Sequence, residues 1–374
     1  MKKLSKIDQN LIINANSKSK LIKHNNDIYT LHSNYLKSNN PIEDNRSENY
    51  SSDKFMLGVF DGHGGWECAS VLSNYLNAYV SKELRLIKNK KSSNKKEDII
   101  NAIKTGFNKL DADILKGGFE NKNYLEPALS GSCAVLLLMD GHDVYVANTG
   151  DCRAVLGKQN EDGMFEAVPL SVDQGVDNLN EVKRLEEEHP GLMPSRAFGD
   201  AVTAEPVVTH YKITPPKITV NKKDQKVLLS GDLFLILASD GLWDDLSNEE
   251  SVKIMQNYLH SNKFIDTFDE KIEKNFVFED LNASTLLIKN SLHKNSKGDI
   301  GKLLSIPYPK CRNYRDDVTV EVLFFFNTNE FLGVGEEGKV TFDKDTKEAD
   351  LKLANKKIDR INISNFISGM KSKL

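Results

Sequence analysis

Aspartates stand at the ends of several short apolar strands in this sequence, and this pattern restricts the fold more than any other feature. Asp240, for example, closely follows the apolar run 233–238. The acids placed in this way are Asp61, Asp151, Asp240, Asp316 and Asp317. A carboxylate at the rim of an apolar strand is costly to desolvate without a partner. We expect these acids to converge on hard cations, which prefer oxygen ligands; the alternative is that each merely begins a turn.

The composition is ordinary for a globular chain. The 374 residues (42.0 kDa) fit one large domain or two small ones. Hydrophobic residues make up 39% and charged residues 28%, which argues against disorder throughout and against a coiled coil. The 50 Lys and Arg residues against 54 Asp and Glu residues give a net charge of −4, so we expect no nucleic-acid partner. No apolar run reaches the roughly 18–20 residues of a membrane-spanning helix, so we expect no membrane span.

The four cysteines indicate reduced thiols rather than a disulfide framework. They are Cys68, Cys133, Cys152 and Cys311. None belongs to a Cys-x-x-Cys pair, and Cys133 lies in an apolar run that predicts a buried thiol. Because no group of cysteines and histidines has the spacing of zinc ligands, a structural zinc site is not expected.

Apolar periodicity predicts helices packed on antiparallel strands in one domain, since no internal repeat or long linker divides the chain. Unbroken or alternating apolar runs predict strands over 55–60, 132–139, 143–148, 153–156, 207–213, 233–238 and 318–326. The residues 140–143 predict a hairpin between two of these strands. Helical spacing predicts helices over 66–86, 99–115, 181–188 and 248–258.

The segments outside this pattern define the expected boundaries. Residues 1–32 are lysine-rich and lack a secretory apolar core, which is typical of either a weak mitochondrial targeting segment or a polar flexible tail. We expect the main domain over 33–327, a helical insertion with polar loops near 264–297, and a C-terminal extension over 328–374. The extension contains a glycine pattern at 333–338 that matches a dinucleotide fingerprint only as a string, because a predicted strand follows it.

Five motifs occur in a fixed order along the chain. They are Phe60-Asp61-Gly62-His63-Gly64-Gly65, Gly150-Asp151-Cys152-Arg153-Ala154, Ser195-Arg-Ala-Phe-Gly-Asp200, Ala238-Ser-Asp240-Gly-Leu-Trp243-Asp244 and Arg315-Asp-Asp-Val-Thr-Val320. Together they closely resemble the metal-dependent serine/threonine protein phosphatases of the type-2C family. Two further runs, Pro41-Ile-Glu43-Asp44-Asn-Arg46-Ser47 and Tyr314-Arg-Asp-Asp317, are most similar to the mitochondrial pyruvate dehydrogenase phosphatase branch. The runs Gly65-Trp66 and Thr203-Ala-Glu-Pro-Val-Val208 resemble its fungal members.

The resemblance implies an α+β fold: an antiparallel β-sandwich flanked by helices on both faces. It also implies a site for two Mg²⁺ or Mn²⁺ ions at one end of the sandwich. By motif position, Asp61 matches the aspartate that bridges the two ions, and Gly62 matches a ligand that uses its backbone carbonyl. Asp240 and Asp316 match the remaining metal-binding aspartates.

Four further residues match family positions near the ions. Glu43 matches an acidic ligand, and Asp44 matches a residue that orients metal-bound water. Asp151 matches a residue that can hold a weaker third ion. His63 matches the general acid that protonates the leaving oxygen; taken alone, it would be interpreted as a turn histidine. The implied chemistry is attack of a metal-activated hydroxide on phosphorus, which needs no Cys or Ser nucleophile.

Two departures from the family pattern concern substrate binding. Many members carry a phosphate-binding arginine where this chain has Asn39, so we expect Asn39, with help from Arg46 or Lys37, to contact the substrate. Relatives also have a flap-forming segment after the motif at 195–200, where only Ala201 and Val202 lead on to the next run. A connection this short cannot form a lid, so we expect an open rim with little recognition of substrate residues distant from the phosphate.

The resemblance therefore implies a metal-dependent protein-serine/threonine phosphatase. Its branch suggests pyruvate dehydrogenase as the phosphoprotein substrate and the mitochondrial matrix as the compartment, with the cytoplasm as the alternative. A catalytically weakened relative that acts as a binding or regulatory module is the alternative function. A metal-dependent nuclease would use similar acids, but the sequence has no basic groove signal.

Overall fold

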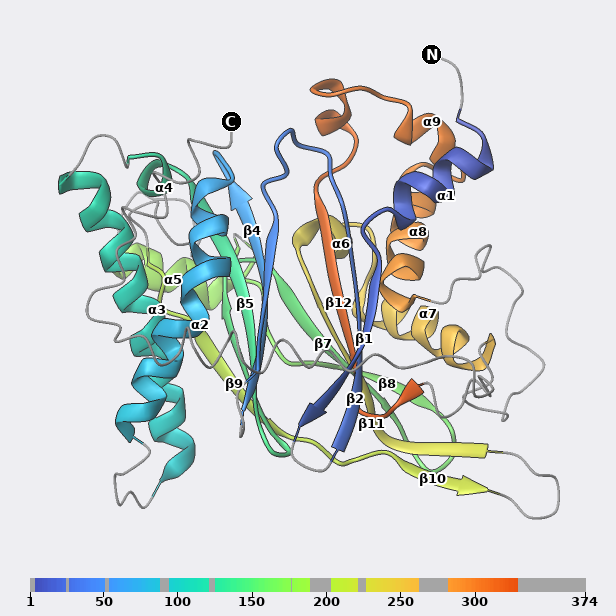
Figure 1. The fold of residues 1–374 in the computed structure, drawn as a ribbon, viewed down its shortest axis with the longest axis horizontal. Helices are drawn as coiled ribbons and strands as arrows, with labels where there is room; N and C mark the ends of the chain where they lie inside the picture. Colours follow the sequence, from blue (N-terminus) through green and yellow to red (C-terminus); the bar gives the residue numbers. More distant parts are fainter. Residues whose placement is uncertain are drawn as a thin grey trace.

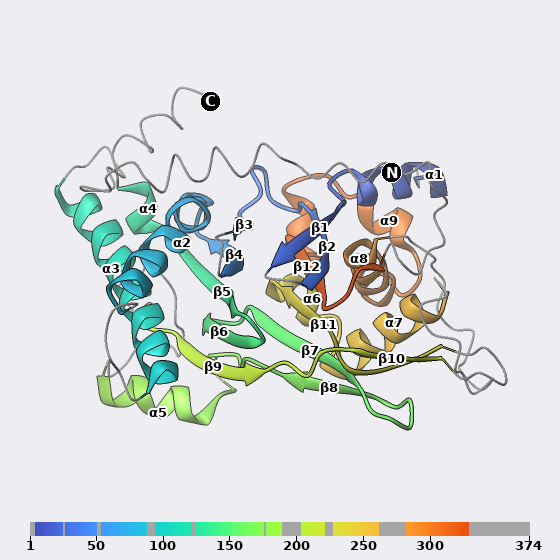
Figure 2. The same cartoon turned by 60° about the horizontal axis from the view of Figure 1, so that its bottom comes forward.

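Two antiparallel sheets pack against each other, and helices cover the outer face of each (Figure 1, Figure 2). The computed structural model describes residues 4–24, 27–50, 54–87, 94–120, 125–175, 177–188, 203–220, 227–261 and 282–328. The α+β sandwich with helices on both faces confirms the fold that the sequence predicts.

The larger sheet is built around β11, a strand of 12 residues. Its pairing order is β1, β2, β12, β11, β7 and β8, and β10 also pairs with β11. The bounds are β1 (Lys18–His24), β2 (Asp27–Leu36), β7 (Arg153–Gln159), β8 (Phe165–Pro169), β10 (Lys217–Val220), β11 (Val227–Ala238) and β12 (Val318–Phe324).

The smaller sheet has the pairing order β3, β4, β5, β6 and β9. The bounds are β3 (Asn45–Tyr50), β4 (Phe55–His63), β5 (Gly131–Asp140), β6 (Asp143–Thr149) and β9 (Val207–Lys212). The predicted hairpin between β5 and β6 is confirmed, because Asp140 pairs with Asp143 and Gly141 takes a φ of +65° in the turn.

Two pairs of helices cover the two sheets from opposite sides. In both views α2 (Glu67–Ile87) and α3 (Lys95–Glu120) lie on the side of the smaller sheet, and α7 (Asn248–Ser261) and α8 (Ala283–Asn295) lie on the other (Figure 1, Figure 2). The remaining helices are α1 (Lys6–Asn14), α4 (Glu126–Leu129), α5 (Leu179–Glu188), α6 (Asp240–Trp243), α9 (Ile300–Leu304) and the 3₁₀ helix η2 (Lys310–Asn313).

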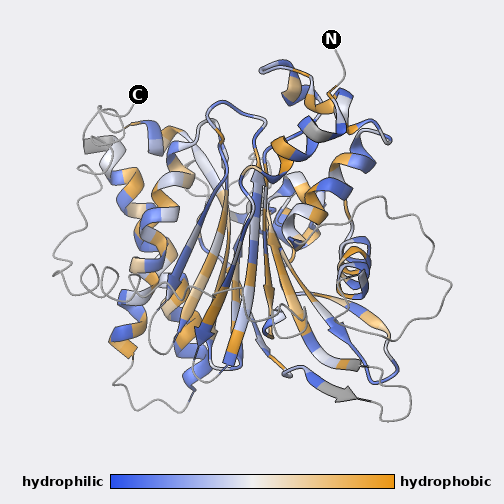
Figure 3. Ribbon diagram, turned by 45° about the vertical axis from the view of Figure 1, so that its right-hand side comes forward, coloured by the Kyte–Doolittle hydropathy of each residue, from blue (hydrophilic) through white to orange (hydrophobic). Residues whose placement is uncertain are grey.

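The central strands are buried on both faces, which explains their unbroken apolar runs. In β11, Phe234 and Ile236 face the helices α7 and α8, whereas Leu235 and Leu237 face the layer between the sheets. All four are 0% exposed. Apolar residues accordingly dominate the central strands, and the covering helices mix apolar and polar stretches (Figure 3). Successive side chains of a strand point to opposite faces, so burial of both faces removes the polar alternation.

The N-terminal segment is part of the sandwich, and the expectation of a flexible tail is wrong for its described residues. α1 packs on the larger sheet, with Ile13 only 1% exposed, and β1 pairs with β2 along its whole length. Polar contacts hold this region: Asn34 donates a hydrogen bond to the Ile13 carbonyl at 2.9 Å, and His32 Nδ1 accepts one from the N–H of Ala283 at 3.0 Å. Because these buried residues are polar, β2 shows no apolar period.

The segment expected to be a helical insertion is only partly described. Its last part forms α8, which is a core helix rather than an insertion, because Leu287 and Ile288 are 0% exposed. The first part of the expected insertion lies outside the described residues. The motif at 195–200, the connection that follows it and the chain from 329 onward also lie outside them. Among the described helices, none combines the length and the apolar character that a membrane crossing requires.

The strand pairing brings several acidic strand ends to one end of the sandwich. Ala238, at the end of β11, pairs with Val320 of β12 on one side and with Arg153 of β7 on the other. The residues just beyond these pairs are Asp240, Asp316, Asp317 and Asp151. β4 of the facing sheet ends in the motif that contains Asp61.

Candidate metal centre

Three aspartates from three strand ends share one small volume. Asp61 lies near the end of β4, Asp151 precedes β7, and Asp240 begins α6 directly after β11. One carboxylate oxygen of each lies within 4.8 Å of those of the other two. The structure thus brings together residues that are up to 179 positions apart in the sequence (240 − 61).

The carboxylates of this group repel one another, and two of them keep an oxygen without a hydrogen-bond partner among the described residues. Asp61 Oδ2 and Asp240 Oδ1 are buried without a hydrogen-bond partner among the described residues. Burial, together with the charges of Asp44 and Asp240, raises the pKa of Asp61 well above its usual value. Burial, with the charges of Asp151 and Asp316, raises the pKa of Asp240 to about 7. Buried oxygens that repel one another are a donor set that a hard divalent cation stabilises.

Asp44 is buried, and only one of its two carboxylate oxygens has a hydrogen-bond partner among the described residues. Its Oδ2 accepts a hydrogen bond from the Ser239 hydroxyl at 2.7 Å, while Oδ1 is buried without a partner among the described residues. Burial and the charge of Asp317 raise the pKa of Asp44 to about 8. One oxygen of Asp44 therefore remains available to a water molecule or a cation.

Glu43 reaches the same region from the loop before β3. A Cβ at Gly62 would lie 2.5 Å from the Glu43 carbonyl oxygen, so this close approach requires glycine. The backbone N–H of Gly65 donates a hydrogen bond to the Glu43 carboxylate. Burial raises the pKa of Glu43, the charge of Arg312 lowers it and the charge of Asp317 raises it, with a net upward shift. The first acidic motif and the glycine-rich turn thus form one unit.

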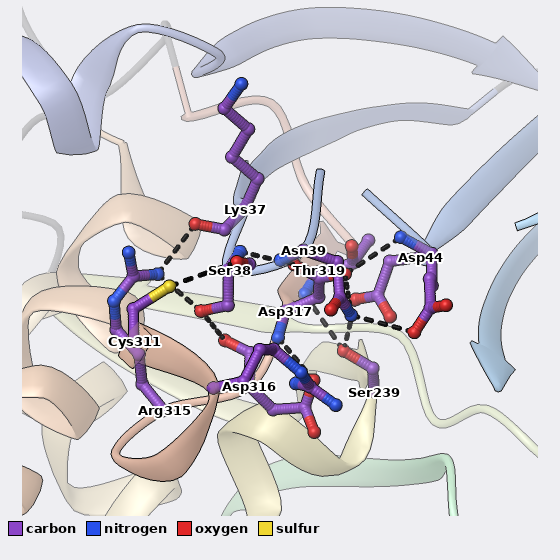
Figure 4. A network of polar contacts seen from close by, with 12 residues as sticks. Lys37, Ser38, Asn39, Asp44, Ser239, Cys311, Arg315, Asp316, Asp317 and Thr319 are labelled. Carbon is purple, nitrogen blue, oxygen red and sulfur yellow. Dashed lines mark hydrogen bonds and ion pairs between the residues drawn. The ribbon is translucent and has the colours of Figure 1, made fainter. Parts of the chain in front are cut away.

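Asp317 anchors the loop that carries Glu43. Its side chain is buried, and it accepts hydrogen bonds from the backbone N–H groups of Asn39 at 2.9 Å and Glu43 at 2.8 Å (Figure 4). The backbone N–H of Ser38 also donates to it. The sequence places Asp317 only among the strand-end acids. Its anchoring role depends on partners 274 to 279 residues away, so no local signal could reveal it.

Asp316 lies at the rim of the site. Its side chain is 36% exposed, and it forms an ion pair with Arg312. Its charge acts on both Asp240 and Glu43, although it is not one of the three acids whose oxygens lie within 4.8 Å of one another. Asp316 therefore belongs to the acidic cluster electrostatically and is accessible at its edge.

His63 ends β4 two residues after Asp61, so the two side chains lie on the same face of the strand. The residue pairs with Gly131 of β5, and its ring lies so close that a Cβ at Gly131 would be 2.1 Å from His63 Nε2. His63 is exposed. The glycine on β5 thus makes room for an accessible imidazole beside the aspartates.

Asn39 lies inside the site, but its amide protons are used there. Its Nδ2 donates hydrogen bonds to Glu43 Oε2 at 2.8 Å and to Asp317 Oδ2 at 3.0 Å. An amide nitrogen has two protons, so both are directed to carboxylates. In this arrangement Asn39 orients the acids, and it has no donor left for a substrate.

Arg46 and Lys37 are not brought to the aspartates. Arg46 on β3 points between the sheets, where its Nη1 donates to Glu48 Oε1 at 2.6 Å and to Glu321 Oε1 at 2.9 Å. Glu321 is 0% exposed, and a buried carboxylate of this kind needs a cation. The Lys37 ammonium points away from the network around Asp317 (Figure 4). In the described structure neither cation lies against the aspartate group, and contact of Arg46 or Lys37 with the substrate stays a prediction.

Solved structures with the same fold include two with TM-scores above 0.5. A serine-threonine phosphatase 2C from Toxoplasma gondii has a TM-score of 0.57 at 15% identity, over 82% of this chain and 98% of that one. A Caenorhabditis elegans sex-determining protein has a TM-score of 0.54 at 17% identity, over 81% of this chain and 66% of that one. At these identities the likeness concerns the fold alone.

The sequence comparisons are more specific. A family model described as protein phosphatase 2C matches residues 30–300. A protein phosphatase 2C homolog of Schizosaccharomyces pombe is 35% identical over 78% of this chain and 79% of its own length. The mitochondrial [pyruvate dehydrogenase [acetyl-transferring]]-phosphatase 1 of Saccharomyces cerevisiae is 31% identical over 76% of this chain and 64% of its own length. Its human counterpart is 29% identical over 78% and 77%. The chain therefore belongs to the protein phosphatase 2C family of metal-dependent protein serine/threonine phosphatases.

Proposed function

We propose that the acidic cluster of this chain holds two divalent cations and that the chain uses them to hydrolyse phosphoserine and phosphothreonine in a protein substrate. The observation that carries this proposal is the group Asp61, Asp151 and Asp240, whose oxygens lie within 4.8 Å of one another. Two of these carboxylates keep a buried oxygen without a partner among the described residues. Buried charges of one sign need a counter-charge, and hard cations match oxygen donors.

The donor set fits Mg²⁺ or Mn²⁺, since it consists of oxygens with no soft ligand. The residues that would hold the two ions are Asp61, Asp240, Asp316, Glu43 and, through its carbonyl, Gly62. Asp151 would hold a third, weaker ion. When bound, the ions would supply Lewis-acid activation of the attacking water and charge stabilisation at the phosphate.

The remaining residues of the site would handle protons. His63 is accessible beside Asp61 and is suited to protonate the leaving serine or threonine oxygen. Asp44 has one oxygen without a partner among the described residues, and this oxygen can accept a hydrogen bond from the attacking water, while Ser239 fixes the other oxygen. These assignments need no covalent intermediate with the protein.

The relatives suggest the substrate and the compartment. Two of the relatives are mitochondrial phosphatases that are named for pyruvate dehydrogenase, at 31% and 29% identity. We propose that the phosphorylated pyruvate dehydrogenase complex is the substrate and that the chain acts in mitochondria. The S. pombe relative, at 35% identity, carries no substrate in its name, so the substrate needs a direct test.

The test is phosphate release from a phosphoserine peptide by the full chain, with Mn²⁺ and then with excess EDTA. We expect release that requires Mn²⁺ and that stops in EDTA. A second assay compares phosphorylated pyruvate dehydrogenase complex with phosphorylated casein at equal phosphate concentration, and we expect a preference for the former.

The controls separate the alternatives. Release that persists in EDTA would contradict the metal-dependent mechanism. A chain that binds the peptide without releasing phosphate would be a binding module. Mn²⁺-dependent cleavage of DNA in a parallel digestion, without phosphate release, would indicate a nuclease.

A further inference from the structure

The acidic cluster repels the substrate that it is proposed to act on. A phosphomonoester carries a charge of about −1.5 to −2 near neutral pH. At the rim of the site, the phosphate would be repelled by the carboxylate of Asp316, whose side chain is 36% exposed, and by the nearby carboxylate of Glu43. Cations bound at the cluster would offset part of this repulsion. A protein donor at the rim would orient the phosphate as well as attract it, because guanidinium N–H groups match phosphate oxygens in pairs.

Among the described residues, three other arginines are committed to partners within the protein. Arg153 binds Asp173 through Nε at 2.9 Å and through Nη2 at 2.5 Å, and its Nη1 donates to Asn248 at 2.9 Å. Arg315 donates through Nη1 to the hydroxyl of Ser38 and to the backbone carbonyl of Lys37. Arg46, described above, is held by two interior glutamates. None of these three is free to turn toward a phosphate without breaking such contacts.

Arg312 differs from them in exposure and in its unused donors. It lies on η2, four residues before Asp316, and its side chain is 33% exposed. Among the described residues its one hydrogen bond runs from Nη1 to Asp316. A guanidinium has five N–H donors, so most of them remain available. The charges of Asp317 and Glu43 also act on Arg312, which places it at the acidic rim.

We propose that Arg312 binds the phosphate oxygens of the substrate, and of the inorganic phosphate product, while Asp316 holds its Nη1. The inference rests on the proposed function for the identity of the substrate. The charge of Arg312 and its N–H donors without partners among the described residues both favour phosphate binding. Asp316 restrains the guanidinium, so less side-chain entropy is lost when phosphate binds. Arg312 would thus perform at the rim the task that the sequence suggested for Asn39 and Arg46.

The test uses the full chain loaded with Mg²⁺ and inorganic phosphate as the probe. Calorimetry gives the Kd of phosphate for the parent, Arg312→Gln, Arg312→Lys and Lys310→Gln. Lys310 is an exposed cation on the same 3₁₀ helix, so its variant removes the same charge without touching Asp316. We expect the Kd to rise about tenfold or more in Arg312→Gln, equivalent to ~1.4 kcal/mol. Arg312→Lys should recover part of the loss, and Lys310→Gln should match the parent within about twofold.

The affinity for Mg²⁺ and the kinetics separate binding from a structural role. If Arg312 binds phosphate, Arg312→Gln raises KM for p-nitrophenyl phosphate, while the Kd of Mg²⁺ stays within about threefold of the parent value. The inference is overturned if the affinity for Mg²⁺ falls while that for phosphate is unchanged at saturating Mg²⁺, or if Lys310→Gln has an equal effect. It is also overturned if the parent binds no phosphate. Calorimetry measures binding without turnover. A chain that binds phosphate through Arg312 but releases none from a phosphopeptide would therefore contradict the proposed function and leave the role of Arg312 intact.

Discussion

Asp317 accepts a hydrogen bond from the backbone N–H of Glu43 at 2.8 Å, across 274 residues of sequence. The same buried carboxylate accepts from the N–H of Asn39 at 2.9 Å. These bonds fix the loop before β3 to the start of β12, and so they fix the first acidic motif relative to the end of the larger sheet. Asp317 is thus a positioning residue that supports the acids of the site.

Replacement of Asp317 by alanine should destabilise the fold. It removes the acceptor of three backbone N–H groups, of which one is buried and two are partly buried. Hydrogen bonds to a charged group contribute about 1.5–3 kcal/mol each when fully buried, and less when solvent can replace the acceptor. We expect Asp317→Ala to lower the free energy of unfolding by about 2–4 kcal/mol, measured by urea denaturation. The matched control is Asp316→Ala, next to it and 36% exposed, with an expected change within about 1 kcal/mol. Equal losses in the two variants would contradict the anchoring role.

The N-terminal helix should contribute to the stability of the whole domain. Ile13 is 1% exposed in the core beside α8, whereas its neighbour Ile12 is 39% exposed. Large-to-small substitutions in a core cost about 2–5 kcal/mol, so we expect Ile13→Ala to lower the free energy of unfolding by at least about 2 kcal/mol. Ile12→Ala should cost less than about 1 kcal/mol. An indistinguishable pair of denaturation curves would show that α1 is not part of the core.

The central strands and the acidic motifs could be predicted because their signals are local. The run 233–238 is apolar throughout, and this pattern follows directly from burial on both faces of β11. Asp240 interrupts that pattern at the strand end, so it can be found from the sequence alone. The convergence of Asp61 and Asp151 with it was expected, and the structure brings the three together.

The rest depends on contacts between distant segments. β2 could not be found by its period, because the buried residues Thr30, His32 and Asn34 are polar and bind partners elsewhere in the chain. Arg46 was expected to help Asn39 at the substrate, because this chain lacks the phosphate-binding arginine of many relatives. The residue that determines its position is Glu321, which lies 275 residues away. Such pairings are fixed by the fold and leave no local pattern.

His63 should matter more when the leaving group is poor. A serine alkoxide needs a proton from a general acid as it departs, whereas a nitrophenolate leaves readily without one. We therefore expect His63→Gln to reduce kcat on phosphoserine peptides at least tenfold more than on p-nitrophenyl phosphate. Equal reductions on both substrates, at saturating Mn²⁺, would mean that His63 is not the acid.

Asp140 should make the fold sensitive to acid. Burial alone would raise its pKa, but Lys54 at 2.8 Å and Lys95 at 3.0 Å outweigh this effect, so its pKa is lowered. The stabilisation is therefore fully present above its unfolded-state pKa of about 3.9, and it is lost as the pH falls through the lower folded-state pKa. Asp140→Asn should be less stable than the parent by up to about 1 kcal/mol at pH 6. The difference in the free energy of unfolding should begin to shrink as the pH falls below the unfolded-state pKa of about 3.9.

Urea denaturation of the parent and Asp140→Asn between pH 3 and 7 checks this expectation. Asp162→Asn is a suitable control, because Asp162 is an exposed acid at the turn between β7 and β8. A difference between Asp140→Asn and the parent that grows as the pH falls would contradict the ion-pair account.

The central claim is that the aspartate cluster holds the cations that drive phosphate hydrolysis. It is tested most directly by the kcat of Asp61→Asn on a phosphoserine peptide at saturating Mn²⁺, beside the parent and Asp162→Asn. Asp61 is one of the three grouped aspartates, and its Oδ2 is buried without a hydrogen-bond partner among the described residues. The amide of Asp61→Asn would lack the charge that the ions require. The account predicts a kcat below about a tenth of the parent value, a loss of more than ~1.4 kcal/mol of transition-state stabilisation, with Asp162→Asn unchanged. An Asp61→Asn protein that keeps more than a tenth of the parent activity would contradict it.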